Sequence, residues 1–227
     1  MKKVWLPVLA LSLILVLFSG CGTADDNGSG SKTGAASTAS EGKTGDDITF
    51  NNVIVSTTSG ITTVYGEVSN TTSKARSFTL KVSFYDKDSK LLGAAVGAVN
   101  NINGGATKIF SAIASGDYSG AANYKVQVDT TVKTENNKPE VVEFSNTVAN
   151  KAANMTTISG EAKNIDTATH SFTLDVGAYD SAGKLIGVAT GAVNDLAAGD
   201  TKTFSAIAAG DLSAAATYKV FVSTLVK

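Results

Sequence analysis

The chain contains the same sequence twice. Phe-Ser-Ala-Ile-Ala at positions 110–114 recurs at 204–208, and Gly-Ala-Val-Asn at 97–100 recurs at 191–194. The offset is the same for both motifs, and more than half of the positions from 60 to 133 are identical to their partners without a gap. Self-similarity at a fixed period indicates one structural unit present in several copies. We therefore expect two domains of one architecture in tandem.

The copies also set the domain boundaries. The first repeat spans residues 47–133, a linker covers 134–140, and the second repeat spans 141–227. A unit of this size buries only about 60% of the surface that its unfolded chain exposes, so each repeat is expected to be stable by only a few kcal/mol. Docking of one repeat against the other would add to this stability.

Apolar and polar residues alternate within each repeat. This period of two is typical of a strand with one buried face. One such strand has its apolar positions at Phe78, Leu80, Val82 and Phe84, matched in the second copy by Phe172, Leu174, Val176 and Ala178. Another closes each repeat, with apolar positions at Tyr124, Val126, Val128 and Val132, matched by Tyr218, Val220, Val222 and Val226.

Turn sequences separate further β-favouring segments of the first repeat, which lie at 49–56, 61–69, 91–99 and 107–113. Six or seven short strands in fewer than about 90 residues favour an antiparallel sandwich. The prediction is an all-β protein of two tandem immunoglobulin-like antiparallel β-sandwich domains, with a small open barrel as the alternative. The alanine-containing segments 114–122 and 208–216 are compatible with one helical turn that crosses between sheets.

Short motifs in both copies resemble the pattern of FxLYD-type extracytoplasmic domains of bacteria. In the first copy they are Gly66 to Asn70, Tyr85-Asp86, Leu92-Gly93, Gly105 and Phe110; in the second they are Gly160 to Asn164, Tyr179-Asp180, Ile186-Gly187, Gly199 and Phe204. The resemblance covers most of each repeat. It implies an envelope-facing sandwich module, and because that family has no general activity it implies no reaction.

The N-terminus has the pattern of a signal peptide over residues 1–20. Lys2 and Lys3 precede an apolar stretch at 4–18, which ends in Ser19-Gly20. The stretch falls short of the roughly 20 apolar residues that a membrane-spanning helix needs. Ser19-Gly20-Cys21 resembles the lipobox of bacterial lipoproteins, in which the cysteine is lipidated on sulfur and becomes the new N-terminus.

The resemblance to a lipobox implies that Cys21 attaches the protein to a membrane. A diacylglyceryl group is the minimum for durable anchoring, because one acyl chain binds only marginally. The expected location is extracytoplasmic, on the bacterial cell membrane, or on the outer membrane if the host has two membranes. The alternative is ordinary secretion with a free thiol. Cys21 is the only cysteine, so no intramolecular disulfide is expected.

The segment 21–46 that follows is rich in Gly, Ser, Thr and Ala and has no large apolar residue. Such a composition cannot offset the entropy of ordering, and we expect a flexible tether with a reach on the order of 25 to 30 Å. The whole chain has 19 basic and 20 acidic residues. This near-neutral balance gives no reason to expect a nucleic-acid partner.

Candidates for catalysis are few. His170 is the only histidine, and its polar surroundings predict an exposed loop residue. Without a second histidine or a free thiol, neither Cys/His catalysis nor a His-rich metal site is expected, and no cofactor is predicted. Recurring carboxylates leave an enzyme with paired acids as a remote hypothesis; they are Glu67, Asp86 and Asp117, repeated as Glu161, Asp180 and Asp211.

Asp86 and Asp180 are interpreted as hairpin-turn acceptors. The sequence from Asp86 begins like a calcium-binding loop, but Lys90 occupies a ligand position and Gly97 stands where a bidentate glutamate is needed.

The two copies differ on the outer face of their last strands. Gln127 and Thr131 of the first copy are replaced by Phe221 and Leu225. Exposed apolar residues on one face are candidates for an interaction surface, and the alternatives are that they meet the first domain or lie under a loop. The first repeat carries a basic excess and the second an acidic excess, which favours docking between domains or between molecules.

Together these features predict a non-enzymatic, lipid-anchored envelope protein whose tandem β-sandwiches form an interaction or structural module. Its expected partners are the membrane through Cys21 and another envelope protein or a cell-wall polymer. The alternative is capture of a cell-wall glycan or small ligand, although the repeats contain no tryptophan to serve as an aromatic platform.

Overall fold

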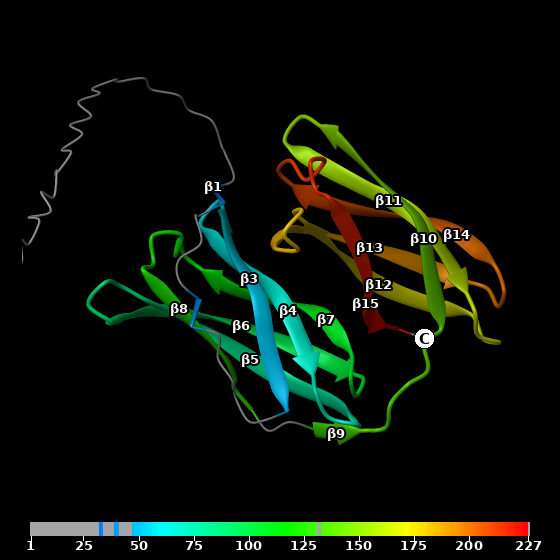
Figure 1. Ribbon diagram of the computed structural model, residues 1–227, viewed down its shortest axis with the longest axis horizontal. Helices are drawn as coiled ribbons and strands as arrows, with labels where there is room; N and C mark the ends of the chain where they lie inside the picture. The colour runs from blue at the N-terminus through cyan, green and yellow to red at the C-terminus, as the bar shows by residue number, and fades with distance from the viewer. Residues whose placement is uncertain (1–31, 34–38, 41–46, 131–132, 227) are drawn as a thin grey trace, which may run out of the picture.

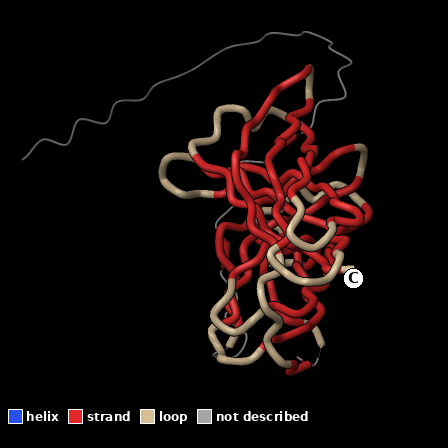
Figure 2. Tube along the Cα trace, turned by 90° about the vertical axis from the view of Figure 1, so that its right-hand side faces the viewer, coloured by secondary structure: helices blue, strands red, loops and turns tan. Residues whose placement is uncertain are grey.

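A computed structural model describes residues 32–33, 39–40, 47–130 and 133–226. Two β domains lie side by side and are joined by one connection (Figure 1). Figure 2 shows strands and loops, and none of the described residues is helical. The predicted signal peptide at 1–20 and the predicted lipidation site at Cys21 lie outside the described residues.

Both domains are built from six antiparallel strands in the same spatial order, which confirms the predicted tandem all-β fold. The first domain has the sheet order β3-β4-β7-β6-β5-β8 and the second has β10-β11-β14-β13-β12-β15. The strands of the first are β3 (Ile48–Thr58), β4 (Ile61–Asn70), β5 (Ala75–Tyr85), β6 (Leu91–Ile102), β7 (Thr107–Ser115) and β8 (Asn123–Val128). Those of the second are β10 (Val142–Ala152), β11 (Met155–Asn164), β12 (His170–Tyr179), β13 (Leu185–Leu196), β14 (Thr201–Ala209) and β15 (Thr217–Leu225).

Each sheet curls over itself where its third and fourth strands meet. In the first domain β6 and β7 pair only at Val96 with Ile113 and at Gly97 with Ala112. A Cβ atom on Gly97 would lie 2.0 Å from the carbonyl oxygen of Ser111, so only glycine allows this approach. The result is a sandwich whose two layers remain connected along one side, a form between the predicted sandwich and the open-barrel alternative.

The alternating apolar residues fill the space between the layers. Phe78, Leu80, Val82 and Phe84 are all buried, as are Phe172, Leu174, Val176 and Ala178, which confirms the predicted period. The centre of each core is a trio of edge-to-face phenylalanines, a favourable aromatic geometry. In the first domain these are Phe50, Phe78 and Phe110, and in the second they are Phe144, Phe172 and Phe204.

The end of β15 departs from the predicted alternation. A register shift opposite Thr173 and Leu174 leaves Ser223 without a partner residue in β12, and such a bulge moves the following side chains to the opposite faces. Leu225 therefore packs against the core of its own domain, whereas Val226 is 64% exposed. The predictions that Leu225 faces outward and Val226 inward are wrong for this reason.

The segments with an expected helical turn form β-turns instead. The amide of Ala121 donates to the carbonyl of Tyr118 at 3.0 Å, and that of Ala215 donates to Leu212 at 3.2 Å. Each is one hydrogen-bonded turn without continuation. In the first domain, a buried threonine fixes the conformation of the residues just before this turn. The Thr62 hydroxyl donates to the carbonyl of Gly116 and accepts from the amide of Tyr118.

Three short strands extend the first domain at positions where composition predicts only tether or linker. β1 (Lys32–Thr33) pairs antiparallel with β3, and β2 (Ala39–Ser40) pairs parallel with β8. β9 (Lys133–Glu135) pairs with β5 and overlaps the predicted linker. Strand edges offer unpaired main-chain groups, so a segment can add to them without apolar side chains of its own. Two short parts of the predicted flexible tether over 21–46 therefore pair with the first domain, which its composition did not predict.

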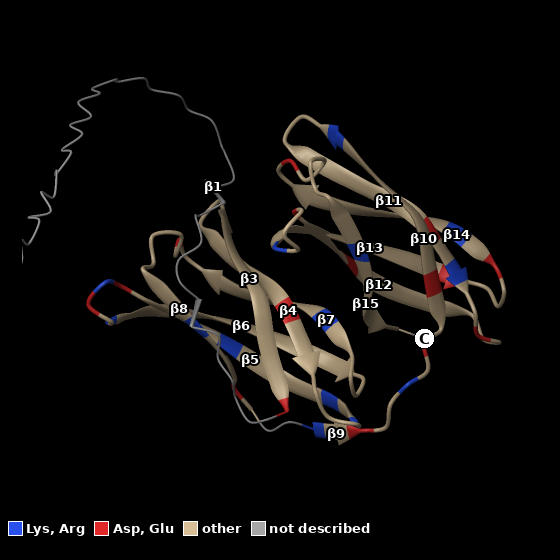
Figure 3. Ribbon diagram, in the orientation of Figure 1, with Lys and Arg blue, Asp and Glu red and all other residues tan. Residues whose placement is uncertain are grey.

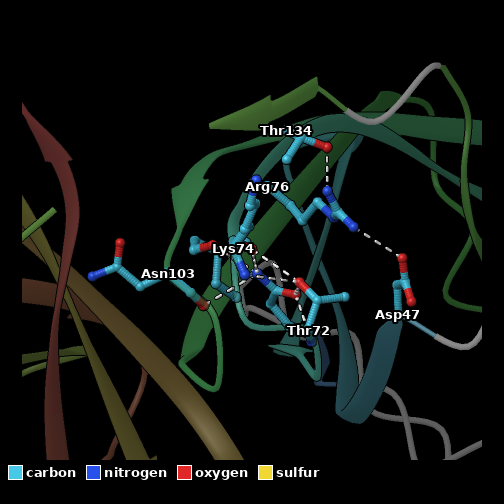
Figure 4. A network of polar contacts seen from close by, with 8 residues as sticks. Asp47, Thr72, Lys74, Arg76, Asn103 and Thr134 are labelled. Carbon is cyan, nitrogen blue, oxygen red and sulfur yellow. Dashed lines mark hydrogen bonds and ion pairs between the residues drawn. The ribbon is translucent and has the colours of Figure 1, made fainter. Parts of the chain in front are cut away.

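The linker is also fastened to the first domain by side chains. The guanidinium of Arg76 contacts Thr134 and forms an ion pair with Asp47 at 3.1 Å (Figure 4). Farther along, the Asn103 side chain donates to the carbonyl of Lys138 at 2.6 Å and accepts from its amide at 2.9 Å. These contacts fix the direction in which the chain enters the second domain.

Candidate interdomain binding site

The domains meet through the outer faces of two sheets. One face belongs to β4 and β7 with part of β3, and the other to β12, β13 and β15. Tyr179 and Leu185 are 1% and 0% exposed, although both point away from the core of their own domain. They form an apolar cluster with Ile54, Tyr65, Ile109, Val188 and Phe221. We call these residues the interdomain cluster.

One carboxylate organises the polar part of this contact. The Tyr179 hydroxyl donates to Oε1 of Glu67 at 2.7 Å, and the side chain of Asn52 donates to Oε2 at 2.7 Å. Burial, followed by the bond to Glu67, raises the pKa of Tyr179 above its usual value. The phenol therefore stays protonated and acts as a donor. Sequence reasoning did not assign Glu67 or Tyr179 to an interface.

The Asn–Glu part of this arrangement belongs to the fold itself. In the second domain Asn146 donates to Oε2 of Glu161 at 2.6 Å in the same way. Asn52 and Asn146 both adopt left-handed backbone angles at the bulge of the first strand, a conformation that asparagine tolerates better than most residues. Glu67 differs from Glu161 in that it also accepts a hydrogen bond from Tyr179 of the other domain.

Two hollows flank the interdomain cluster. One, which we call the linker groove, has a volume of about 380 Å³. It is bounded by the start of β7, the linker residues 138–140, the first residues of the second repeat and the end of β15. The other, about 450 Å³, lies between the β3–β4 hairpin and the 209–212 turn, and we call it the hairpin groove. Both combine residues of the two domains, as ligand sites at domain interfaces commonly do.

Lys108, Lys138 and Glu140 line the linker groove, and Asp175 lies near enough to Lys108 to interact with its charge. Burial lowers the pKa of Lys108 below its usual value, although the nearby Glu140 acts in the opposite direction. Burial raises the pKa of Asp175, while a hydrogen bond from Ser223 acts to lower it. Lys108 belongs to the first domain and Asp175 to the second, so their attraction favours docking. Lys108 is the one basic residue of β7 and Asp175 the one acidic residue of β12, and Figure 3 shows where charged residues lie on the strands.

The predicted interaction residues have different environments. Phe221 packs against the interdomain cluster, so the alternative in which it meets the first domain is the correct one. Leu225 packs on the core of the second domain and also lines the linker groove. The prediction of a shared outer surface for the two residues is therefore wrong, although both border the same groove.

His170 is not an exposed loop residue. It is the first residue of β12, it is 6% exposed, and its Nε2 lies 2.7 Å from Oδ2 of Asp166. The amide of Thr167, and then His170, lower the pKa of Asp166. The prediction failed because Asp166 provides a local partner that allows the imidazole to be buried.

The recurring aspartates have structural contacts. Oδ1 of Asp86 accepts from the amides of Asp88 and Lys90, both at 2.9 Å, and Asp180 accepts in the same way from Ala182 and Lys184. The interpretation of both as turn acceptors is confirmed.

Across the described ranges, no cluster of three or more His, Cys, Asp or Glu side chains is arranged to hold a metal ion. The same part of the chain contains no helical stretch with the length and hydropathy needed to cross a bilayer. Comparisons with models of known protein families, with curated proteins and with solved structures give no match.

Proposed function

We propose that this protein is a lipid-anchored envelope protein whose two docked β domains form a non-enzymatic interaction module. The anchor is supported by the basic start, the apolar stretch and the Ser19-Gly20-Cys21 motif. The extracytoplasmic role is supported by the resemblance of both repeats to FxLYD-type domains.

The observation that carries the binding role is the docking of the two domains. The interdomain cluster and the Tyr179–Glu67 hydrogen bond hold two different outer faces together, and the fastened linker restricts their separation. The composite surface includes two grooves that neither domain has alone. A fixed surface of this kind lowers the ordering cost of binding a partner.

Palmitate labelling tests the anchor. Wild-type protein should incorporate labelled palmitate and sediment with membranes, whereas Cys21→Ala should lose both properties. Val8→Ala, within the apolar stretch, is the matched control that retains the motif. Labelling that persists in Cys21→Ala would contradict the anchor and favour ordinary secretion.

Mild crosslinking in the native envelope, followed by affinity capture and mass spectrometry, tests the module. A stoichiometric protein partner that is lost when the interdomain contact is disrupted would support the proposal. Co-purification of wall polysaccharide without a protein partner would replace the proposal with glycan capture.

A further inference from the structure

The edge of β15 forms one wall of the linker groove. Six consecutive residues of this strand, Val220 to Leu225, line the groove. Alternate residues of a strand point to opposite faces. A groove that is lined by consecutive residues therefore contacts both faces, which places it at the edge of the strand. Within the described ranges, β15 is the last strand of its sheet and pairs only with β12. Its other edge therefore has main-chain donors and acceptors available for an added strand.

The first domain shows what such an edge accepts in this fold. β8 is the counterpart of β15, and its edge carries the parallel strand β2, with Ala39 opposite Tyr124 and Ser40 opposite Lys125. The opposite edge of that sheet carries β1. Both edges of the first domain are thus extended by added strands, whereas the corresponding edges of the second sheet carry none among the described residues.

Lys108 supplies an available cationic donor within the groove. Its counterpart in the second domain, Lys202, donates to the carbonyls of Asn194 and Asp195, both at 2.8 Å. Lys108 has a single hydrogen bond, to the carbonyl of Asn100 at 3.3 Å, and no ion pair with any described carboxylate. An ammonium group has three donors, so Lys108 can bind an anion that enters the groove. Lys138 adds a second positive charge to the lining and Glu140 adds one negative charge, so the lining keeps a net positive charge.

Apolar side chains complete the lining. Phe221, Val222 and Leu225 contribute from β15, Pro139 contributes from the linker, and Val141 contributes from the start of the second repeat. An extended peptide needs this combination, because main-chain bonds to a strand edge provide affinity and pockets for alternate side chains provide selectivity. The volume of about 380 Å³ is at the small end of the range for ligand sites, which suits a few residues.

We propose that the linker groove binds the end of an extended peptide, which adds as a strand to the free edge of β15 and places a carboxylate against Lys108. The carboxylate is the C-terminus of the peptide, because a groove of this size holds only the last few residues. This inference specifies the ligand of the proposed interaction module and does not depend on the lipid anchor.

A peptide array tests the proposal with the full chain in detergent micelles. The probes are tetrapeptides randomised at their last three positions, each prepared as a free acid and as a C-terminal amide. Fluorescence anisotropy then measures the strongest binders. We expect micromolar affinity for a subset of the free acids and at least about tenfold weaker binding of their amides. Amides that bind as tightly as their free acids, including those that contain Asp or Glu, would contradict recognition of the C-terminal carboxylate.

The duplication provides matched controls. Lys108→Gln should weaken binding at least about tenfold, whereas Lys202→Gln should change it less than about twofold. Thr107→Trp should fill the groove and abolish binding, whereas Thr201→Trp, at the equivalent exposed position, should not. Thermal unfolding establishes that each variant is folded. Absence of any peptide binding below about 1 mM, or binding that survives both Lys108→Gln and Thr107→Trp, would overturn the proposal while leaving the palmitate result unaffected.

Discussion

At the scale of single residues, one buried asparagine in each domain organises the connection between the two sheet layers. The Asn164 side chain donates to the carbonyls of Ala168 and Leu196 at 2.7 and 2.9 Å and accepts from the amide of Asp166 at 2.9 Å. Asn70 makes the corresponding bonds in the first domain. A buried amide with its donors and acceptor satisfied fixes both the turn and the end of a neighbouring strand.

Asn164→Ala should destabilise the second domain by about 3 kcal/mol, because it leaves buried carbonyl groups without partners. Urea unfolding monitored by tyrosine fluorescence measures this difference. Asn150→Ala, on the exposed part of β10, is the matched control and should change stability by less than about 0.5 kcal/mol. Equal effects of the two substitutions would show that the Asn164 network is not stabilising.

Residue identity alone predicted some of these roles. Asp86 and Asp180 were recognisable as turn acceptors because their bonds are local in sequence. Tyr179 and Glu67 were not recognisable as partners, because their bond joins positions in different domains and depends on how those domains dock.

At the scale of elements, the alternation of apolar residues predicted the central strands correctly. It failed at the end of β15, since a bulge is set by the pairing with β12 and not by the sequence of β15 itself. The short strands β1, β2 and β9 were also missed. Their pairing uses main-chain groups, which every residue except proline supplies in full.

The curl of each sheet depends on glycine at the crossing point. Gly97→Ala would bring a Cβ atom against the backbone of β7, and a backbone oxygen cannot move aside as a flexible side chain can. We expect a loss of about 2 to 3 kcal/mol in the stability of the first domain. Gly120→Ala is the control, because a Cβ atom there meets nothing within 4 Å. Thermal unfolding compares the two, and a Gly97→Ala protein as stable as Gly120→Ala would contradict this account of the curl.

At the scale of the whole molecule, the two copies have diverged so that only one pair of faces docks. The contact joins unlike faces, and contacts of this kind can propagate from molecule to molecule. The faces left free lack three of its apolar residues, because Ser159, Thr203 and Gln127 replace Tyr65, Ile109 and Phe221, although Leu91 and Val148 are retained there. A repeated contact would also bring Lys81 towards Lys202 in place of the Asp175 and Lys108 pair. These differences oppose end-to-end assembly.

Leu185→Asp should separate the domains. Leu185 is 0% exposed in the interdomain cluster, whereas its counterpart Leu91 is 57% exposed. An unpaired carboxylate at the buried position should weaken docking by about 3 kcal/mol or more, while Leu91→Asp should have little effect. Small-angle scattering should report a larger radius of gyration for Leu185→Asp, and proteolysis should cut residues 134–140 faster. Unchanged scattering from Leu185→Asp would show that the cluster does not hold the domains together.

If Cys21 carries the proposed lipid, the pairing of β1 with β3 limits how far the first domain can stand from the membrane. Fully extended, the chain from Cys21 to Asp47 would span at most about 90 Å, whereas the part from Cys21 to Lys32 spans at most about 40 Å. With a lipid at Cys21, the pairing of β1 would therefore reduce by more than half the distance from the membrane that the extended tether alone would permit to the first domain. A lipid-anchored protein held in this shallow layer would have a higher effective concentration towards partners near the membrane, and it would reach partners farther from the membrane less readily.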